Sequence, residues 1–366
     1  MQITEYIVKG IVLELIFMKL LHIISSLEVG GAQRLLSDLV PIQKQQGLDV
    51  EVLVNTRIDN DFTKKIQDAG VKIISLDEPR IYSLSNIFRL RKIMKNYDVV
   101  HVHLFPSVYL VAVASIGLKT KLVYTEHSTS NRRREKAYFR PVEKFVYRRY
   151  KRVISISQQT QDALQSWLQS KDDRFVVINN GVDTKSFSAL SRPVLPKSLI
   201  MVSRFAASKD QETLIRAMRL VDSEAVLRLV GDGENLEHCK GVAEKEGVAD
   251  RVHFLGTRSD IAELIAESYI GVQSSNWEGF GLTAVELMAA GKPVVASDVD
   301  GLKQVVEGAG LIFRKGDAEE LACHITRLLD DSSYYDTVAE NCRNRAPLYD
   351  ISVMAGYYKN VYSSLI

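Results

Sequence analysis

Short runs of apolar residues, many of them β-branched, alternate with amphipathic stretches along most of the chain. Runs of this length predict β-strands, and the apolar spacing between them is typical of helices. In the first half the expected strands are 19–24, 49–54, 71–76, 99–103, 121–125, 153–157 and 176–179. In the second half they are 199–203, 225–230, 252–255, 270–274, 294–297 and 311–313.

Regular alternation of strand and helix predicts parallel, doubly wound sheets. The pattern is interrupted by a loop with Pro193 and Pro196 and then restarts, and beyond residue 318 it is helical without a further strand. We therefore predict an α/β chain with two Rossmann-like domains. The expected divisions are a tail at 1–17, a first domain at 18–183, a linker at 184–197, a second domain at 198–348 and a final segment at 349–366.

Composition agrees with two globular domains. A chain of 366 residues is longer than one hydrophobic core usually supports, and 46% hydrophobic with 25% charged residues is ordinary for a globular protein. The net charge is only +2. Three cysteines at unrelated spacings favour neither a disulfide framework nor a zinc site, so we expect a cytoplasmic protein.

The N-terminal region contains an apolar run at 11–24. It carries Glu14, Lys19 and His22, so it is too short and too interrupted to predict a transmembrane helix. No signal-peptide cleavage site follows it. We interpret residues 1–17 as a tail that precedes the first domain.

The loops that follow the strands are the places to look for a site, because open parallel sheets bind ligands beyond the carboxyl ends of their strands. After the first strand come Gly30 and Gly31, which would let backbone approach a ligand closely. A plain tight turn is the alternative. The GxGxxG fingerprint is absent, so a dinucleotide site is not supported.

Two cations follow the first strand of the second domain. Arg204 and Lys209 lie on one loop that leads into a predicted helix at 211–220. A guanidinium fork, an ammonium and a helix N-terminus together suit a diphosphate. The alternative is a pair of solvated side chains.

Two carboxylates flank a glycine turn in the stretch 276–297. Glu278 precedes Gly-Phe-Gly, and Glu286 lies in the predicted helix at 281–290. Carboxylates accept hydrogen bonds from a vicinal diol such as that of a ribose or a sugar ring. Two surface glutamates are the alternative, although that reading leaves the surrounding glycines unexplained.

These motifs, taken together, resemble those of the retaining GT-B glycosyltransferases of family 4. The resemblance runs from Met18 through nearly the whole chain, and its most specific element is the pair of glutamates with seven residues between them. The motifs are Glu-Gly-Phe-Gly-Leu…Glu at 278–286, Ser-Arg-Phe with Lys-Asp at 203–210, Val-Gly-Asp-Gly-Glu at 230–234, Asn-Asn-Gly-Val-Asp at 179–183 and Asp-Val-Val-His-Val-His at 98–103. The resemblance implies GT-B architecture: two Rossmann-like domains with parallel sheets facing a central cleft, and a last helix, near 354–364, that crosses back onto the first domain.

The resemblance also implies roles for single residues. Glu286 would bind the donor ribose, Glu278 and His127 would contact the donor sugar, and Arg204 and Lys209 would hold the diphosphate, so that Arg204, Lys209, Glu278 and His127 form the expected catalytic set. The other expected donor-binding residues are Gly231, Gly256, Thr257, Arg258, Ile261, Gly279, Phe280, Gly281 and Leu282. On the acceptor side we expect Gly30, Gly31 and His103.

The predicted function is transfer of a sugar, with retention of configuration, from a nucleotide-diphosphate sugar to a glycan or lipid-linked acceptor in cell-surface polysaccharide or glycolipid synthesis. A UDP-sugar is favoured and a GDP-sugar is the second choice. The resemblance implies neither a metal nor a cofactor and no nucleic-acid partner. An inactive GT-B scaffold is the alternative; donor sugar, acceptor and linkage stay open.

Three further patterns compete with this interpretation. Asp-x-Asp occurs at 59–61 and 298–300, and we expect Asp298 to serve a turn or a helix cap rather than a metal. We place His101 and His103 on opposite faces of their strand, with His103 the one that could reach the cleft. Glu126 and His127 could act together as a general base, but we prefer His127 as a sugar contact.

The stretch 132–152 has ten basic and two acidic residues, a local net charge of +8, with aromatic residues in between. This suits an anionic membrane surface, at the inner face of the membrane, or a lipid-pyrophosphate acceptor. The alternative is a helix with a buried aromatic face and a solvated basic one. A nucleic-acid reading has no accompanying motif.

Overall fold

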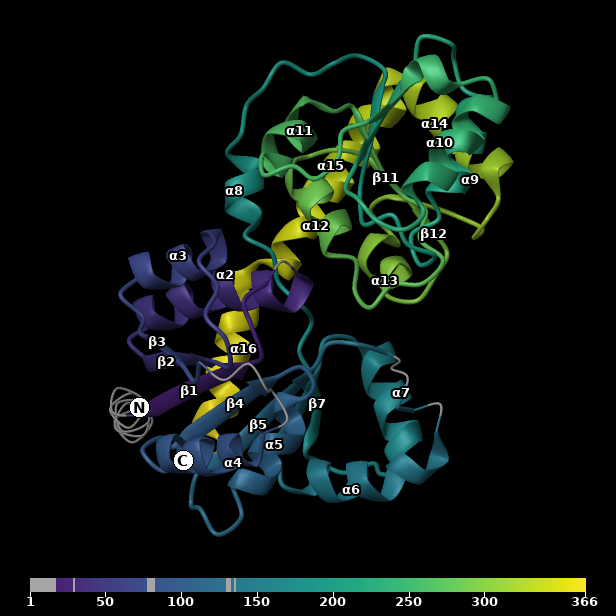
Figure 1. Cartoon of the computed structure of the whole chain (residues 1–366). Coiled ribbons are helices and arrows are strands. Elements are labelled where there is room, and N and C mark those ends of the chain that lie inside the picture. Colours follow the sequence, from purple (N-terminus) through teal and green to yellow (C-terminus); the bar gives the residue numbers. More distant parts are fainter. Residues whose placement is uncertain (1–17, 29, 78–82, 130–132, 135) are drawn as a thin grey trace, which may run out of the picture. The chain divides into compact units, whose positions relative to one another are not determined.

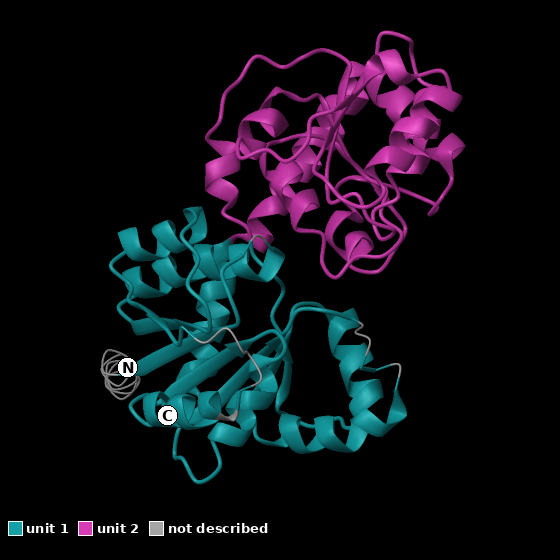
Figure 2. Cartoon of the chain, in the orientation of Figure 1, with its two compact units in different colours: residues 1–181, 351–366 teal, residues 182–350 magenta. Residues whose placement is uncertain are grey.

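The computed structural model describes residues 18–28, 30–77, 83–129, 133–134 and 136–366 (Figure 1). The predicted tail at 1–17 lies outside them. Contacts divide the chain into two compact units: unit 1 is 1–181 with 351–366, and unit 2 is 182–350 (Figure 2).

Unit 1 is built on a seven-stranded parallel sheet in the order β3-β2-β1-β4-β5-β6-β7. The strands are β1 (Lys19–Ile24), β2 (Asp49–Val54), β3 (Ile73–Ser75), β4 (Val99–His103), β5 (Lys121–Glu126), β6 (Arg152–Ser155) and β7 (Phe175–Val177). The helices are α2 (Gly31–Gln45), α3 (Asp61–Asp68), α4 (Leu84–Met94), α5 (Ser107–Ala114), α6 (Arg140–Arg148), α7 (Gln158–Leu168) and α16 (Ile351–Ser363), with a 3-10 turn η1 (Ala137–Phe139).

Alternation along each strand gives this sheet two apolar faces. Leu20 and Ile24 of β1 pack with α2, α3 and α16, whereas Leu21 and Ile23 pack with the layer of α4 to α7. Successive side chains of a strand point to opposite faces, which is why one strand supplies both cores. The last helix of the chain, α16, therefore completes a core that begins with the first strand.

Unit 2 repeats the plan with a six-stranded parallel sheet in the order β10-β9-β8-β11-β12-β13. The strands are β8 (Ser198–Val202), β9 (Val226–Val230), β10 (Val252–Phe254), β11 (Ile270–Gln273), β12 (Val294–Ser297) and β13 (Leu311–Phe313). The helices are α8 (Thr184–Ser188), α9 (Gln211–Met218), α10 (Leu236–Lys245), α11 (Ile261–Glu267), α12 (Leu282–Ala289), α13 (Leu302–Val306), α14 (Ala318–Asp330) and α15 (Ser332–Arg345), with η2 (Ala249–Arg251) and η3 (Ala346–Tyr349).

Both sheets have the doubly wound order in which the first strand of the unit lies next to the fourth. Chain direction across the sheet reverses at that point, and ligands of such sheets bind in the crevice beyond it. The two switch points are β1 next to β4, and β8 next to β11. The predicted strands are confirmed, with differences of one to two residues at several ends.

The chain passes between the units twice, at 181–182 and at 350–351. Within unit 2 the ends of these crossings are bonded to each other: the Val182 N–H donates to the Tyr349 carbonyl at 2.9 Å, and the Thr184 hydroxyl donates to the Asp350 carboxylate at 2.5 Å. Residues at the two crossings are thus joined although they are 166 positions apart.

Candidate functional site

Two side chains predicted from sequence meet at the switch point of unit 2. Lys209 lies on the loop after β8 and Glu278 on the loop after β11, and their side chains form an ion pair. The second carboxylate oxygen of Glu278 accepts from the Gly279 N–H at 3.1 Å. Both side chains are only about one-fifth exposed, at 21% and 19%.

Hydrogen bonds to backbone carbonyls hold these two loops together. Asn276 donates from its N–H to the Ser208 carbonyl at 2.8 Å and from its amide to the Ala207 carbonyl at 3.0 Å. The Ser274 hydroxyl donates to the Asp210 carbonyl at 2.8 Å. The loop positions of Lys209 and Glu278 are therefore fixed by neighbours that sequence reasoning did not select.

Asp210 ends the first of these loops by capping α9. Its carboxylate accepts from the Thr213 N–H at 3.3 Å and from the Thr213 hydroxyl at 2.7 Å. Burial raises the pKa of this carboxyl above its usual range, and the bonds from Thr213 oppose the rise. The cap orients the N-terminus of α9 directly behind Lys209.

Arg204 lies on the same loop, but its side chain is 73% exposed and pairs with Glu234 at 3.2 Å. Its backbone is better fixed than its side chain, because Gln211 donates to the Arg204 carbonyl at 3.0 Å. An exposed ion pair of this kind stabilises the fold very little. The guanidinium is thus available to a ligand at small cost.

Gly231 lets the loops after β8, β9 and β10 approach one another. Its φ of +133° lies in the region that disfavours side chains, and a Cβ there would lie 2.1 Å from the Ser203 carbonyl oxygen. Its N–H donates to the Gly256 carbonyl at 2.8 Å. Gly231 and Gly256, both predicted donor-site residues, are therefore adjacent.

The other predicted residues after β10 are arranged differently. Arg258 is committed to Asp260, with contacts of 2.8 and 2.6 Å from its guanidinium to the carboxylate. Thr257 is exposed, and Ile261 is the first residue of α11. The Arg258 side chain would have to leave Asp260 before it could bind a nucleotide base.

The Gly-Phe-Gly turn leads into α12, which begins at Leu282 with Gly281 as its N-cap. Phe280 is buried and packs edge-on against Tyr349 at 5.5 Å, so that only its backbone faces the loop. Glu286 follows in the second turn and is 2% exposed. A carboxylate is rarely buried to this degree unless the surroundings hold it.

In unit 1, the predicted residues lie at the β1–β4 switch point. Gly30 caps α2 and Gly31 begins that helix. His103 ends β4 and is buried, and His127 follows β5 and is half-buried. The two imidazoles are joined from His103 Nδ1 to His127 Nε2 at 3.2 Å.

The prediction that His101 and His103 lie on opposite faces of their strand is wrong. Residues two positions apart share a face, because side chains alternate along a strand. The two ring centroids are 4.3 Å apart, and His22 of β1 joins them at 5.1 and 5.3 Å. His22 is a residue that sequence reasoning missed; its signal is its place in register with His101 on the neighbouring strand.

His22, His101 and His103 offer ring nitrogens within 4.8 Å of one another, a spacing that a metal ion could use. All six ring nitrogens already have hydrogen-bond partners, however, and these include Gln43, Tyr362, Thr125 and His127. Metal binding would have to break several of these bonds. We therefore interpret the cluster as a hydrogen-bonded network.

The competing patterns do not assemble into sites. Asn60 caps α3, and Asp59 pairs with Arg57. Asp298 lies in a bend after β12 and pairs with Lys303 at 3.0 Å, whereas the N-cap of α13 is Gly301. Of the two roles expected for Asp298, the turn agrees with the structure and the cap does not. The carboxylate of Glu126 is bound to Arg134 and Tyr147 rather than to His127.

The basic stretch is divided between buried and exposed groups. Arg134 pairs with Glu126, and Arg133 with the fully buried Glu143 at 3.1 Å. Tyr147 and Tyr150 are buried, whereas Tyr138 and Phe145 are exposed. Arg132 and Glu135 lie outside the described residues. The aromatics thus do not form one buried face.

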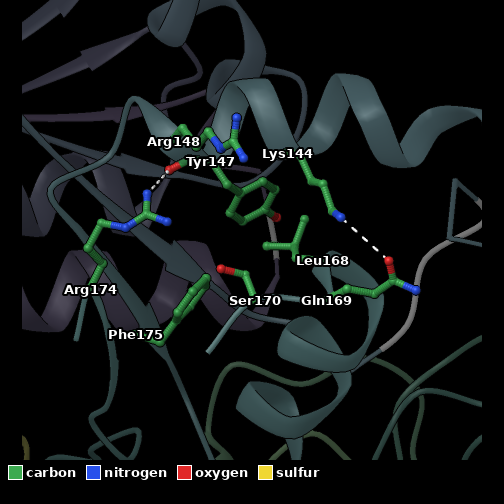
Figure 3. A pocket seen from close by; sticks show the side chains of 8 residues that line it. All are labelled: Lys144, Tyr147, Arg148, Leu168, Gln169, Ser170, Arg174 and Phe175. Carbon is green, nitrogen blue, oxygen red and sulfur yellow. Dashed lines mark hydrogen bonds between the residues drawn. The ribbon is translucent and has the colours of Figure 1, made fainter. Parts of the chain in front are cut away.

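The pocket in Figure 3 lies beside this stretch and is lined by Lys144, Tyr147, Arg148, Leu168, Gln169, Ser170, Arg174 and Phe175. Phe175 is the first residue of β7, so the pocket is at the amino-terminal edge of the sheet. The switch point lies beyond the carboxyl ends of the strands, at the opposite edge of the sheet. The pocket is separate from the site described above.

Comparison with known families shows to which family the chain belongs. The family model described as Glycosyl transferases group 1 matches residues 182–345, and that described as Glycosyltransferase Family 4 matches residues 29–186. The chain is a family 4 glycosyltransferase. The predicted family is confirmed, and each family model falls largely on one unit of this glycosyltransferase.

Two curated relatives are similar over most of the glycosyltransferase. One is the N,N'-diacetylbacillosaminyl-diphospho-undecaprenol alpha-1,3-N-acetylgalactosaminyltransferase of Campylobacter jejuni, 25% identical over 84% of this chain and 89% of the relative. The other is the UDP-Gal:alpha-D-GlcNAc-diphosphoundecaprenol alpha-1,3-galactosyltransferase of Escherichia coli, 25% identical over 72% of this chain and 74% of the relative.

Among solved structures, HepE of Anabaena superimposes with a TM-score of 0.83 at 24% identity, over 95% of this chain and 100% of that chain. HepE was solved with UDP and with UDP-glucose. This likeness confirms the predicted fold: the glycosyltransferase has GT-B architecture. Within the part of the chain that the structure describes, no helix is long and apolar enough to cross a membrane.

Proposed function

We propose that this glycosyltransferase moves a sugar from a nucleotide-diphosphate sugar, a UDP-sugar before a GDP-sugar, to a glycan or lipid-linked acceptor in cell-surface polysaccharide or glycolipid synthesis. The observation that carries the proposal is the Lys209–Glu278 pair at the switch point of unit 2. The similarity to transferases whose names contain an undecaprenol-linked diphosphate, and to a UDP-bound structure, supports it.

In this proposal Lys209 and Arg204 bind the diphosphate, and Glu278 binds hydroxyls of the sugar. The bond from the anomeric carbon to the diphosphate oxygen breaks, the acceptor oxygen bonds to that carbon, and the acceptor proton passes to the departing diphosphate. Negative charge grows on the leaving group, so fixed cations stabilise the transition state more than the ground state. Reaction on one face of the sugar retains the configuration.

Glu286 is proposed to hold the ribose. It is buried in the second turn of α12, the helix that begins at Leu282 directly after the Gly-Phe-Gly loop. A buried carboxylate keeps its geometry, and its oxygens match two neighbouring hydroxyls. The backbone of Gly279 and Gly281, together with Gly231, Gly256, Thr257 and Ile261, is proposed to surround the nucleotide.

The test is release of the nucleotide from UDP-, GDP- and ADP-sugars, with chelator present, by the wild type and by Arg204→Ala. We expect one nucleotide to be preferred, hydrolysis without metal, and a loss in Arg204→Ala. NMR of the glycosylated product would report its anomeric configuration. Absence of turnover with every nucleotide sugar, and of binding, would favour the inactive scaffold instead.

We further propose that α6 contacts an anionic membrane at the inner face. Val142 and Phe145 of α6 are 49% and 53% exposed and lie three residues apart, so they share a helical side. Tyr138, in the 3-10 turn η1 just before α6, is 68% exposed. Lys144 and Arg148, which line the pocket in Figure 3, flank them. Exposed apolar residues bordered by cations suit the surface of anionic lipid.

Co-sedimentation with vesicles checks this membrane contact. We expect binding to vesicles that contain phosphatidylglycerol, weaker binding to phosphatidylcholine alone, and loss of binding in the double variant Val142→Ser with Phe145→Ser. Phe88→Ser is the matched control, because Phe88 is 74% exposed on α4. Equal binding of the double variant and the control would contradict the contact.

A further inference from the structure

A buried hydrogen-bonded chain links α2 to His127. The Gln43 carbonyl Oε1 lies 2.8 Å from His22 Nε2, His22 Nδ1 lies 3.0 Å from His103 Nε2, and His103 Nδ1 lies 3.2 Å from His127 Nε2. The residues come from α2, β1, β4 and the end of β5. Gln43, His22 and His103 are buried.

The three histidines of this hydrogen-bonded chain are uncharged at neutral pH. Burial lowers the pKa of His22 and of His127 to about 4, and it lowers that of His103 well below the usual value. A neutral imidazole carries one N–H, so one ring nitrogen donates and the other accepts. The state of one ring therefore dictates that of the next.

The amide of Gln43 gives the chain its direction. Its Oε1 can only accept, so His22 carries its proton on Nε2 and accepts at Nδ1. His103 must then donate from Nε2 and accept at Nδ1, and His127 must donate from Nε2. This leaves Nδ1 of His127 without a proton.

A second branch holds the amide in this orientation. Gln43 Nε2 donates to the Tyr362 hydroxyl at 3.4 Å, which donates to His101 Nδ1 at 2.6 Å, and His101 Nε2 donates to the Thr125 hydroxyl at 2.7 Å. Reversing the amide would require every donor in both branches to reverse. Coupled chains of this kind are cooperative.

We propose that Gln43 is a positioning residue, which acts through His22 and His103 to fix His127 as the Nε2–H tautomer, with Nδ1 free to accept a hydrogen bond from a sugar hydroxyl. Among the described residues, His127 Nδ1 has no hydrogen-bond partner. His127 lies at the carboxyl end of β5, where ligands of such sheets bind. The catalytic consequence rests on the proposed function; the tautomer does not.

The test is ¹⁵N NMR of the full chain labelled at histidine, without ligand. Correlations between ring nitrogens and ring protons distinguish the two tautomers, and we expect His127 as Nε2–H in the wild type. Gln43→Met removes the carbonyl at similar size and should give a mixture of tautomers at His127. Gln43→Glu keeps an acceptor and should restore the Nε2–H form.

Kinetics then separate positioning from folding. Gln43→Met should lower kcat on the order of tenfold, as expected for one weakened hydrogen bond in the transition state, with unchanged affinity for the free nucleoside diphosphate. Gln161→Met, on α7 and outside the network, is the matched control. Thermal unfolding of each variant checks that it is folded.

Three results would overturn the inference. One is the Nδ1–H form of His127 in the wild type, which needs no variant. Another is stoichiometric metal in the purified protein, since a metal on His22, His101 and His103 would break the chain of bonds. The third is a changed tautomer in Gln43→Met with wild-type kcat. A wild type that shows the expected tautomer but turns over no nucleotide sugar refutes the proposed function and not the chain of bonds.

Discussion

Lys209 and Glu278 lie 69 residues apart in the chain and form a mostly buried ion pair. Removing one partner leaves the other charge with less compensation, which is costly in a site of low solvent access. A diphosphate can replace Glu278 as the partner of Lys209, and sugar hydroxyls can replace Lys209 as the partner of Glu278. In the proposed function, the pair keeps both groups ordered until a donor separates them.

Lys209→Ala should lower kcat by about 10²- to 10³-fold, or roughly 2.7 to 4 kcal/mol of transition-state stabilisation, because one fixed charge beside the leaving group is lost. Steady-state release of nucleotide from the preferred donor measures it. Lys240→Ala is the matched control, since Lys240 also pairs with a glutamate, Glu237, but on the surface of α10. Similar rates in both variants would contradict the role of Lys209.

At the scale of single residues, the sequence indicates candidate site residues but not their surroundings. The spacing of seven residues between Glu278 and Glu286 marked both acids as candidates, and in the structure Glu286 is buried. The commitment of Arg258 to Asp260 and the pairing of Arg204 with Glu234 depend on loop geometry, which spacing along the chain does not encode. His22 and Gln43 were missed because a buried polar network becomes visible only when strands and helices are assembled.

At the scale of elements, the loops of the proposed donor site depend on close backbone contact. Gly231 supports the loop after β8, and Gly301 supports Glu278: a Cβ at Gly301 would lie 2.6 Å from the Glu278 carbonyl oxygen, with φ at +87°. Both positions exclude a side chain for two reasons, the contact and the dihedral angle. These glycines therefore fix the course of the loops that carry Arg204 and Glu278.

Gly231→Ala should destabilise unit 2 by about 1 to 3 kcal/mol more than Gly308→Ala does, because both have positive φ but only Gly231 lacks room for a Cβ. Urea unfolding followed by circular dichroism measures the difference. The same variant should bind nucleotide more weakly, since Ser203 must move. Equal free energies of unfolding in the two variants would show that a Cβ at Gly231 does not destabilise unit 2 through its contact with Ser203.

The strands were the most predictable elements. Runs rich in valine such as 99–103 and 294–297 are buried on both faces, and the structure begins and ends these strands as predicted. Short edge strands were less predictable: the run 71–76 becomes β3 at Ile73–Ser75, where only one neighbour supplies hydrogen bonds. Tertiary pairing, which the sequence pattern does not contain, decides those ends.

At the scale of the whole molecule, the histidine network makes stability depend on pH. His22 is neutral when folded, with a pKa of about 4, and it returns to about 6.5 when unfolded. Between these values the unfolded chain binds more protons, so the free energy of unfolding decreases as pH falls. His101, His103 and His127 shift in the same direction.

The midpoint of urea unfolding should therefore fall as pH is lowered from 6.5 toward about 4, and His22→Asn should flatten this dependence. His253→Asn is the matched control, because His253 is an exposed residue of β10. A slope that is the same in His22→Asn and in the wild type would mean that buried histidines do not set the pH dependence.

Binding of UDP to the full chain, measured by calorimetry without metal, tests the central claim most directly. The expected result is a saturable heat in the wild type, an affinity weakened by roughly 10- to 150-fold in Glu286→Ala through loss of charge-assisted hydrogen bonds, and wild-type affinity in Lys240→Ala. If GDP or ADP binds in place of UDP, the donor base is corrected and the site stands. Equal affinity in the wild type and Glu286→Ala, or no binding of any nucleoside diphosphate, would contradict a donor site in unit 2.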